Sequence, residues 1–356
     1  MAGVHAQTVC GGGNPPAVRA MEAEKEYHFN ASQLEAGLAS LVGLGVTRLL
    51  VRDRAITGSR DGFLGFLERA LREAPDIFYK FYVEPSVVDG QLCQLLSNFH
   101  CSLQLRLDAA ALSGRKSFER KIGLLNRSGL VFGFDLEFAS NAADSAKLFK
   151  ERLNLALSLY PNHIDFPQLE EGLPAPTQFF SSRDIALVAD KSHACSLFYS
   201  EGRAVPWFLT VLKPLRISAD AFFADFAEWL ACNNLARGSL SAESGKGTIS
   251  CQLSHQEIER MQLLFLELKY QEKALEHLLP VVQELVRFNG AFARLVGEDV
   301  EGELDLAFHP DDLESPCSQD VAAFAESVCM EHCRIRLCWM QDREGNNFPG
   351  WQFVQE

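Results

Sequence analysis

The sequence has 356 residues, of which 47% are hydrophobic and 22% are charged, proportions typical of a globular protein with a sizeable core. The formal net charge of −14 argues against nucleic acid and anionic membranes as partners, because both repel an acidic surface. No apolar run approaches the roughly 18 residues of a membrane span, and residues 1–29 lack the profile of a signal peptide. Ten cysteines scattered along a long chain are typical of free thiols, so we expect a cytoplasmic protein.

Two hydrophobic patterns alternate in the first half of the chain. Apolar or β-branched runs predict strands at 46–53, 77–84, 101–108, 129–138 and 163–170. Segments with helical spacing precede or separate them, at 30–45, 62–74, 89–99, 117–129 and 145–161. This alternation, with a period of roughly 30 residues, indicates a parallel sheet of βα units. Residues 5–9 are a candidate sixth strand at the edge of that sheet.

The pattern changes after residue 180. An apolar turn is expected before a helix that begins near Ser218, and the Gly/Ser-rich stretch 235–250 is the best candidate for a flexible linker. Residues 254–297 are predicted to be helical, with a break at Pro280. Alternating runs predict two strands of a small sheet, at 302–310 and 333–341. The expected divisions are an N-terminal segment (1–29), a βα domain (30–180) and a mainly helical domain with a small terminal β element (181–356).

Several short motifs in the βα domain resemble those of a known family. Asp53 and Arg54 follow the second expected barrel strand, Glu84 ends the third, and Asp135 and Leu136 match the motif on the fifth. In these motifs and in segment order the chain resembles radical S-adenosylmethionine enzymes, in particular the cobalamin-dependent group with a helical C-terminal extension. The resemblance implies an α/β fold, a partial (β/α)5–6 TIM-like barrel followed by a mainly helical domain.

The chain departs from this family at the residues that carry its chemistry. The family binds a [4Fe–4S] cluster through Cys-x3-Cys-x2-Cys, and the matching positions here are Cys10, Asn14 and Ala17. One thiolate cannot hold three irons. The Gly-Leu-Pro turn of the family is replaced by residues 139–141, and no cobalamin-binding segment precedes the expected barrel. We therefore expect no iron–sulfur cluster and no resident cofactor, and S-adenosylmethionine remains the candidate ligand.

Polar side chains are expected at the carboxyl ends of successive strands, where βα barrels bind ligands. The candidate ligand-binding residues are Asp53, Arg54, Glu84, Arg106, Asp108, Asp135, Glu137 and Gln168. Together they suit a small polar molecule such as an adenosyl or amino-acid group. The alternative is that these charges pair with one another in a closed network that fixes strand register. We expect Asp53 to point into the barrel mouth and Arg54 to face away from it or reach over the rim.

Other motifs give no catalytic or metal assignment. The spacing of Cys329, Cys333 and Cys338, near His332, does not match a zinc site, and we expect packing thiols, with Cys329 and Cys333 one helical turn apart. The Gly-rich stretches at 10–16 and 242–248 do not have the spacing of a phosphate-binding loop. No metal site is therefore expected, and catalytic residues are not assigned.

The sequence leaves three functional hypotheses. The favoured one is a degenerate radical-S-adenosylmethionine-like protein, a pseudoenzyme that binds a small polar ligand or serves as an accessory to a protein partner. The second is an active enzyme: either a radical enzyme truncated before its cluster segment, or an acid–base catalyst using Asp53, Glu84 and Asp135. The third is an interaction protein whose aromatic residues at 206–208 and 348–353 contact a partner, although those residues equally suit anchors of the C-terminal domain.

Overall fold

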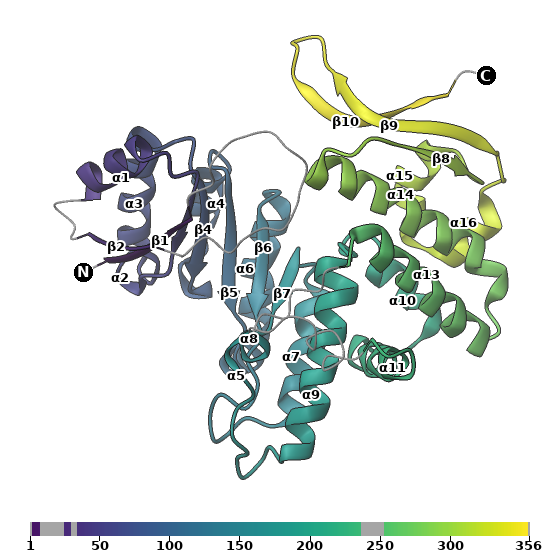
Figure 1. Ribbon diagram of the computed structural model, residues 1–356, viewed down its shortest axis with the longest axis horizontal. Coiled ribbons are helices and arrows are strands. Elements are labelled where there is room, and N and C mark those ends of the chain that lie inside the picture. Colours follow the sequence, from purple (N-terminus) through teal and green to yellow (C-terminus); the bar gives the residue numbers. More distant parts are fainter. Residues whose placement is uncertain (1, 8–24, 30–33, 236–252, 355–356) are drawn as a thin grey trace. The chain divides into compact units, whose positions relative to one another are not determined.

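The computed structural model describes residues 2–7, 25–29, 34–235 and 253–354 (Figure 1). The chain forms two compact units, Met1–Leu136 (unit 1) and Glu137–Glu356 (unit 2). The expected domain boundaries at residues 29 and 180 stay predictions. The expected cluster segment around Cys10 and nearly all of the expected linker lie outside the described residues.

Unit 1 contains a mixed α/β arrangement built on six strands in the order β2-β1-β3-β4-β5-β6. The strands are β1 (Ala2–Gln7), β2 (Lys25–Phe29), β3 (Arg48–Val51), β4 (Phe78–Val83), β5 (Cys101–Arg106) and β6 (Val131–Asp135). Neighbours from β3 to β6 are parallel, which confirms four of the expected strands and their direction. The candidate strand at 5–9 is only partly right, because β1 lies inside the order and runs antiparallel to both β2 and β3.

The helices of unit 1 connect these strands. They are α1 (Leu34–Gly43), α2 (Arg54–Thr57), α3 (Arg60–Glu73), η1 (Pro85–Val87), α4 (Gly90–Leu96), α5 (Ala109–Ser113) and α6 (Arg115–Arg127). Side chains cap their first turns: Ser59 accepts a hydrogen bond from the backbone N–H of Gly62, and Asp89 accepts one from Leu92. These caps satisfy backbone groups that a helix leaves free at its start, and so fix where α3 and α4 begin.

The sheet of unit 1 has one apolar face, and helices cover it. Alternate residues of a strand point to opposite faces, which places Tyr79 and Phe81 on the same side. Phe63 of α3 contacts Phe81 with ring centroids 5.0 Å apart, and Phe66 of α3 contacts Tyr79 at 6.2 Å. All four rings are buried, so this face forms the core of the unit.

Unit 2 is mainly helical. Its helices are α7 (Ala146–Ser158), α8 (Pro167–Glu171), α9 (Ser182–Cys195), the π-helical η2 (Ser196–Glu201), α10 (Phe208–Leu215), α11 (Ala219–Cys232), α13 (His255–Glu272), η3 (Glu276–Leu278), α14 (Leu279–Glu298), α15 (Pro310–Glu314), η4 (Pro316–Gln319) and α16 (Val321–Ser327). Its strands are β7 (His163–Asp165), which was expected as the fifth strand, and β8 (Gly302–Leu306), β9 (Cys333–Gln341) and β10 (Asn347–Phe353). The last three form an antiparallel sheet in the order β10-β9-β8.

Several expectations for unit 2 need correction. The long helical stretch breaks at residues 273–278 rather than at Pro280, which lies in the first turn of α14, where proline is tolerated. The apolar turn before Ser218 contains α10, although Ser218 does cap the next helix. Cys329 is exposed and Cys333 begins a strand, so the two thiols do not share a helical face.

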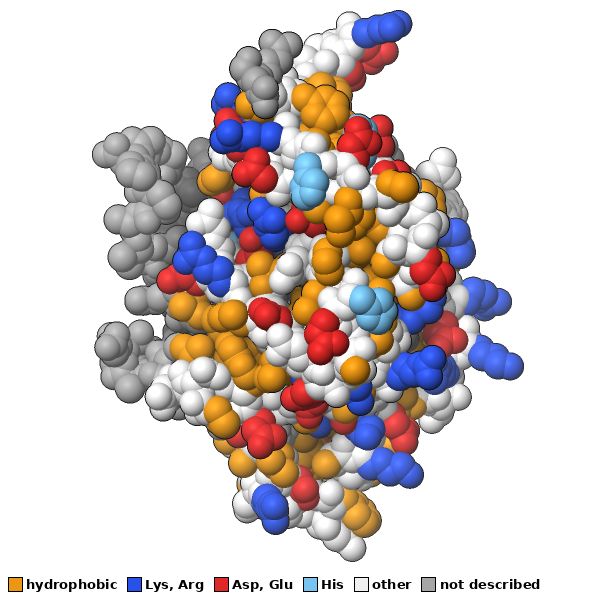
Figure 2. Space-filling model, turned by 90° about the vertical axis from the view of Figure 1, so that its right-hand side faces the viewer, with side chains coloured by type: hydrophobic (Ala, Val, Ile, Leu, Met, Phe, Trp, Pro, Cys, Tyr) orange, Lys and Arg blue, Asp and Glu red, His pale blue; other side chains and the backbone are white. Residues whose placement is uncertain are grey.

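The surface of the described residues is mixed in character. On the face shown in Figure 2, hydrophobic side chains lie in several areas between acidic and basic ones. Exposed apolar residues such as Leu264 and Leu268 on α13 are a normal feature of globular proteins. Among the helices that the structure describes, none is long and apolar enough to cross a membrane.

A buried polar cluster joins α13 and α14 in unit 2. Nη1 of Arg294 lies 3.2 Å from Nδ1 of His255 and 2.5 Å from Oε2 of Glu259. Nε2 of His255 lies 3.4 Å from the carbonyl oxygen of Gly202, which suits a neutral ring that accepts at Nδ1 and donates at Nε2. Burial, together with the charges of Arg203 and Arg294, lowers the pKa of His255 to about 4. The ring is therefore neutral in the folded protein at pH 7.

This cluster predicts acid sensitivity. The pKa of His255 is lower in the folded chain than the usual 6.5, so the unfolded chain binds more protons between those values and stability falls as pH drops through that window. Lowering the pH from 7.5 to 5 should reduce the free energy of unfolding in urea by about 2 kcal/mol more for the wild type than for His255→Asn, whose side chain does not titrate. Equal losses in the two proteins would contradict the neutral histidine.

Candidate ligand site

Six of the eight residues selected from the sequence belong to unit 1, and all six lie at the carboxyl edge of its parallel strands. In chain order they are Asp53 and Arg54 after β3, Glu84 after β4, Arg106 and Asp108 at the end of β5, and Asp135 at the end of β6. The register places Arg106 opposite Asp135 on neighbouring strands. Parallel strands bring their carboxyl ends to one edge, which is why residues far apart in sequence meet here.

Three of these residues surround an open depression of about 410 Å³. Glu84, Arg106 and Asp108 line it together with Lys121 of α6, and Phe118 is among its apolar lining residues. Arg106 and Asp108 are exposed, so these two charges are not part of a buried ion-pair network. The depression therefore presents two carboxylates and two cations around one space.

Local structure fixes two of the acidic groups at this edge. Asp108 caps α5, where one carboxylate oxygen accepts hydrogen bonds from the backbone N–H groups of Ala110 and Ala111 at 3.0 and 3.2 Å. Oε1 of Glu84 lies 3.6 Å from Nη2 of Arg54, in a pair that is open to water on both sides. A pair of this kind is worth at most about 1 kcal/mol, so Glu84 can exchange Arg54 for a ligand at little cost. The predicted inward direction of Asp53 stays a prediction.

Lys121 is a site residue that sequence reasoning missed. Its Nζ donates a hydrogen bond to the carbonyl oxygen of Ser86 in η1, which ties α6 to the loop after β4. Burial and the neighbouring charge of Arg120 lower the pKa of Lys121. The available signal was its place three residues after the buried Phe118, on the apolar stripe of the helix, where a lysine is unusual.

The face of the sheet opposite the aromatic core is polar, and it runs up to the same edge. The Arg52 guanidinium lies 4.8 Å from the ring centroid of Tyr82, and its Nη2 is 3.2 Å from the Tyr82 hydroxyl. Gln104 is 1% exposed and donates a hydrogen bond of 2.7 Å from Nε2 to Oδ1 of Asp135. Residues two positions further on, Glu84 and Arg106, continue this face to the depression. The polar residues at every second position from Lys80 to Glu84 were the signal for it.

The remaining two candidates lie in the other unit. Glu137 and Gln168 belong to unit 2, so the depression of unit 1 is formed without them. Gln168 lies in α8, and its Oε1 is buried without a hydrogen bond to the residues that the structure describes.

The described cysteines of unit 1 do not fit an iron–sulfur cluster. Cys93 lies in α4 and Cys101 at the amino end of β5, and both are buried. Two thiols are fewer than the three that the cluster of this family needs. Burial raises the pKa of both, that of Cys101 to about 12. Within the described ranges, no three His, Cys, Asp or Glu side chains come together to hold a metal.

No protein-family model and no curated protein matches this sequence. Among solved structures, the chain is similar to the radical S-adenosylmethionine methyltransferase TsrM from Kitasatospora setae with tryptophan substrate and the analogue aza-SAM bound, with 13% identity, a TM-score of 0.32 and coverage of 43% of this chain and 35% of that chain. A second structure of TsrM, with cobalamin and a [4Fe-4S] cluster bound, gives 14% identity, the same TM-score and coverage of 40% and 29%. The match thus spans about a third of that enzyme, and a TM-score this low establishes neither its fold nor its activity for this chain.

The tie between α6 and η1 gives a direct test of how the depression is held open. The substitution Lys121→Met removes the charged group that donates a hydrogen bond to the carbonyl of Ser86. A hydrogen bond of this kind stabilises the folded state by about 1.5–3 kcal/mol. Amide hydrogen exchange in residues 84–90 should then become about tenfold faster. The matched control is Lys116→Met, an exposed lysine on the same helix, which should leave exchange in 84–90 unchanged. Equal exchange in the two variants would show that Lys121 does not hold this loop.

Proposed function

We propose that this chain is a binding protein for a small zwitterionic ligand of the S-adenosylmethionine type, held at the carboxyl edge of a partial (β/α) barrel. The observation that carries the proposal is the mixed-charge depression lined by Glu84, Arg106, Asp108 and Lys121. No bond-breaking step is assigned to it, because the segment that the resemblance aligns with the cluster motif has a single cysteine, Cys10.

The strand order supports the barrel. From β3 to β6 each strand lies beside its predecessor, with no reversal of direction along the sheet. Right-handed crossovers then place the connecting helices on one face, and α3 and α6 do pack on the aromatic face through Phe63 and Phe118. A doubly wound sheet would reverse at a switch point and carry helices on both faces. The polar face opposite these connecting helices corresponds to a barrel interior.

The charges of the depression define the ligand class. An amino-acid group carries an ammonium and a carboxylate a few ångströms apart. Glu84 and Asp108 suit the ammonium, and Arg106 suits the carboxylate through a two-pronged hydrogen bond. S-adenosylmethionine, its demethylated product S-adenosylhomocysteine and methionine all carry this group. Because the sequence resembles S-adenosylmethionine enzymes, we expect a ligand that also carries an adenosyl group.

Titration calorimetry with S-adenosylmethionine, S-adenosylhomocysteine, methionine and adenosine tests the proposal. The three ligands with an amino-acid group should bind the wild type, and adenosine should bind at least tenfold more weakly. Arg106→Gln and Glu84→Gln should each weaken the affinity for S-adenosylhomocysteine by about 10- to 100-fold, because each removes the charge that pairs with one end of the amino-acid group.

The matched control is Arg115→Gln, whose exposed guanidinium pairs with Glu119 on α6 and does not line the depression. Its affinity for S-adenosylhomocysteine should equal that of the wild type. The proposal is wrong if no ligand with an amino-acid group binds, or if Arg115→Gln weakens binding as much as Arg106→Gln does.

A further inference from the structure

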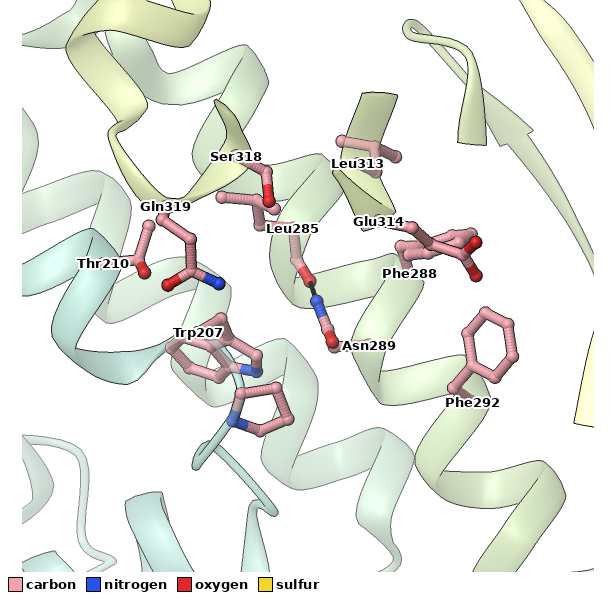
Figure 3. Close-up of a pocket in the computed structure, with 11 residues that line it drawn as sticks. Trp207, Thr210, Leu285, Phe288, Asn289, Phe292, Leu313, Glu314, Ser318 and Gln319 are labelled. Carbon is pink, nitrogen blue, oxygen red and sulfur yellow. Dashed lines mark hydrogen bonds between the residues drawn. The ribbon is translucent and has the colours of Figure 1, made fainter. Parts of the chain in front are cut away.

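Unit 2 contains a second pocket, with a volume of about 300 Å³. It lies between α10, α14, α15 and η4, and Figure 3 shows the residues that line it. They are Pro206, Trp207, Thr210, Leu285, Phe288, Asn289, Phe292, Leu313, Glu314, Ser318 and Gln319. The volume equals that of about ten water molecules at ~30 Å³ each, which leaves room for a small single-ring molecule.

The walls of this pocket combine buried aromatic and aliphatic side chains with polar ones, among them Thr210 and Ser318. Trp207, Leu285 and Phe288 are 2–3% exposed, so packing on the core side holds them in place. Phe292 of α14 contacts Phe288 with ring centroids 5.0 Å apart and is half-buried. A ligand that enters therefore meets a preformed wall in which aromatic and aliphatic groups are mixed with polar ones, as is usual in a small-molecule site.

Two polar groups of the lining would fix the orientation of a bound ligand. Nδ2 of Asn289 donates a hydrogen bond of 2.8 Å to the carbonyl oxygen of Leu285, which leaves its Oδ1 as an acceptor (Figure 3). The carboxylate of Glu314 lies on the side of the two phenylalanine rings in the same view. Partial burial raises the pKa of Glu314, and a hydrogen bond from the Trp351 side chain opposes this rise. The residue is exposed, so its carboxylate can accept a cation as a further partner.

The charge balance favours a cation. Glu314 is the only charged side chain among the described lining residues. Lys213 of α10 does not line the pocket, and its Nζ is engaged 2.5 Å from Oδ2 of Asp320. An anionic ligand would meet a carboxylate with no cation in the lining, whereas an ammonium would meet the opposite charge of Glu314.

We infer that this pocket binds a small amine with an aromatic or aliphatic body, its ammonium group at Glu314 and an N–H donor at Oδ1 of Asn289. The body of the ligand lies against Trp207, Leu285 and Phe288. The inference rests only on unit 2 and is independent of the ligand proposed for unit 1.

A set of three ligands of nearly equal shape separates charge from packing: 2-phenylethylamine, 2-phenylethanol and 3-phenylpropionate. Quenching of tryptophan fluorescence and calorimetry report binding, because Trp207 lines the pocket. The amine should bind the wild type at least tenfold more tightly than the alcohol, and the carboxylate should bind most weakly. Equal affinities for the three, or no binding of the amine, would overturn the inference.

Variants test the assigned carboxylate. Glu314→Gln should weaken the amine at least tenfold and leave the alcohol unchanged, which excludes a general loss of folding. Glu326→Gln, an exposed residue on α16, is the matched control and should bind the amine as the wild type does. An unchanged amine affinity in Glu314→Gln would show that the ammonium group does not lie at Glu314.

Discussion

The arrangement of unit 1 depends on the alternation of side chains along its parallel strands. On β4, Tyr79 and Phe81 pack under α3, and their neighbours Lys80 and Tyr82 point to the opposite face. A shift of register by one residue would bury the polar set and expose the aromatic set, so the core fixes the register. The same register determines where Glu84 and Arg106 emerge, which means that hydrophobic burial on one face positions the charges at the carboxyl edge.

Polar interactions then shape what the core has positioned. Asp108 is used as a helix cap and Lys121 as a tie to Ser86, so both are held in place before any ligand arrives. Glu84 has an exposed partner in Arg54 and retains the capacity to bind a ligand. The pocket of unit 2 differs in its charge, because its lining combines aromatic, aliphatic and uncharged polar groups with a single carboxylate. The two sites therefore suit different ligands, one zwitterionic and one cationic.

The sequence predicts the parallel strands and their terminal charges well, because period-two runs followed by charged residues are strong local signals. It does not predict β2 or the antiparallel direction of β1, since pairing is decided by contacts far apart in the chain. Lys121 was missed because its role depends on a carbonyl 35 residues away. Pro280 was misread as a helix break, because proline suits the first turn of a helix as well as its end. Local sequence signals thus locate the helices, the strands and the charged strand ends. Which elements pair with one another depends on tertiary contacts, which these signals do not contain.

The central claim is that the carboxyl edge of unit 1 holds a small zwitterion, and a crystal structure of the wild-type protein with S-adenosylhomocysteine tests it most directly. The account predicts ligand density in the depression of unit 1, with the carboxylate of the ligand at Arg106 and its ammonium group at Glu84 or Asp108. Density for the ligand against other elements, with the depression holding only solvent, would contradict the account.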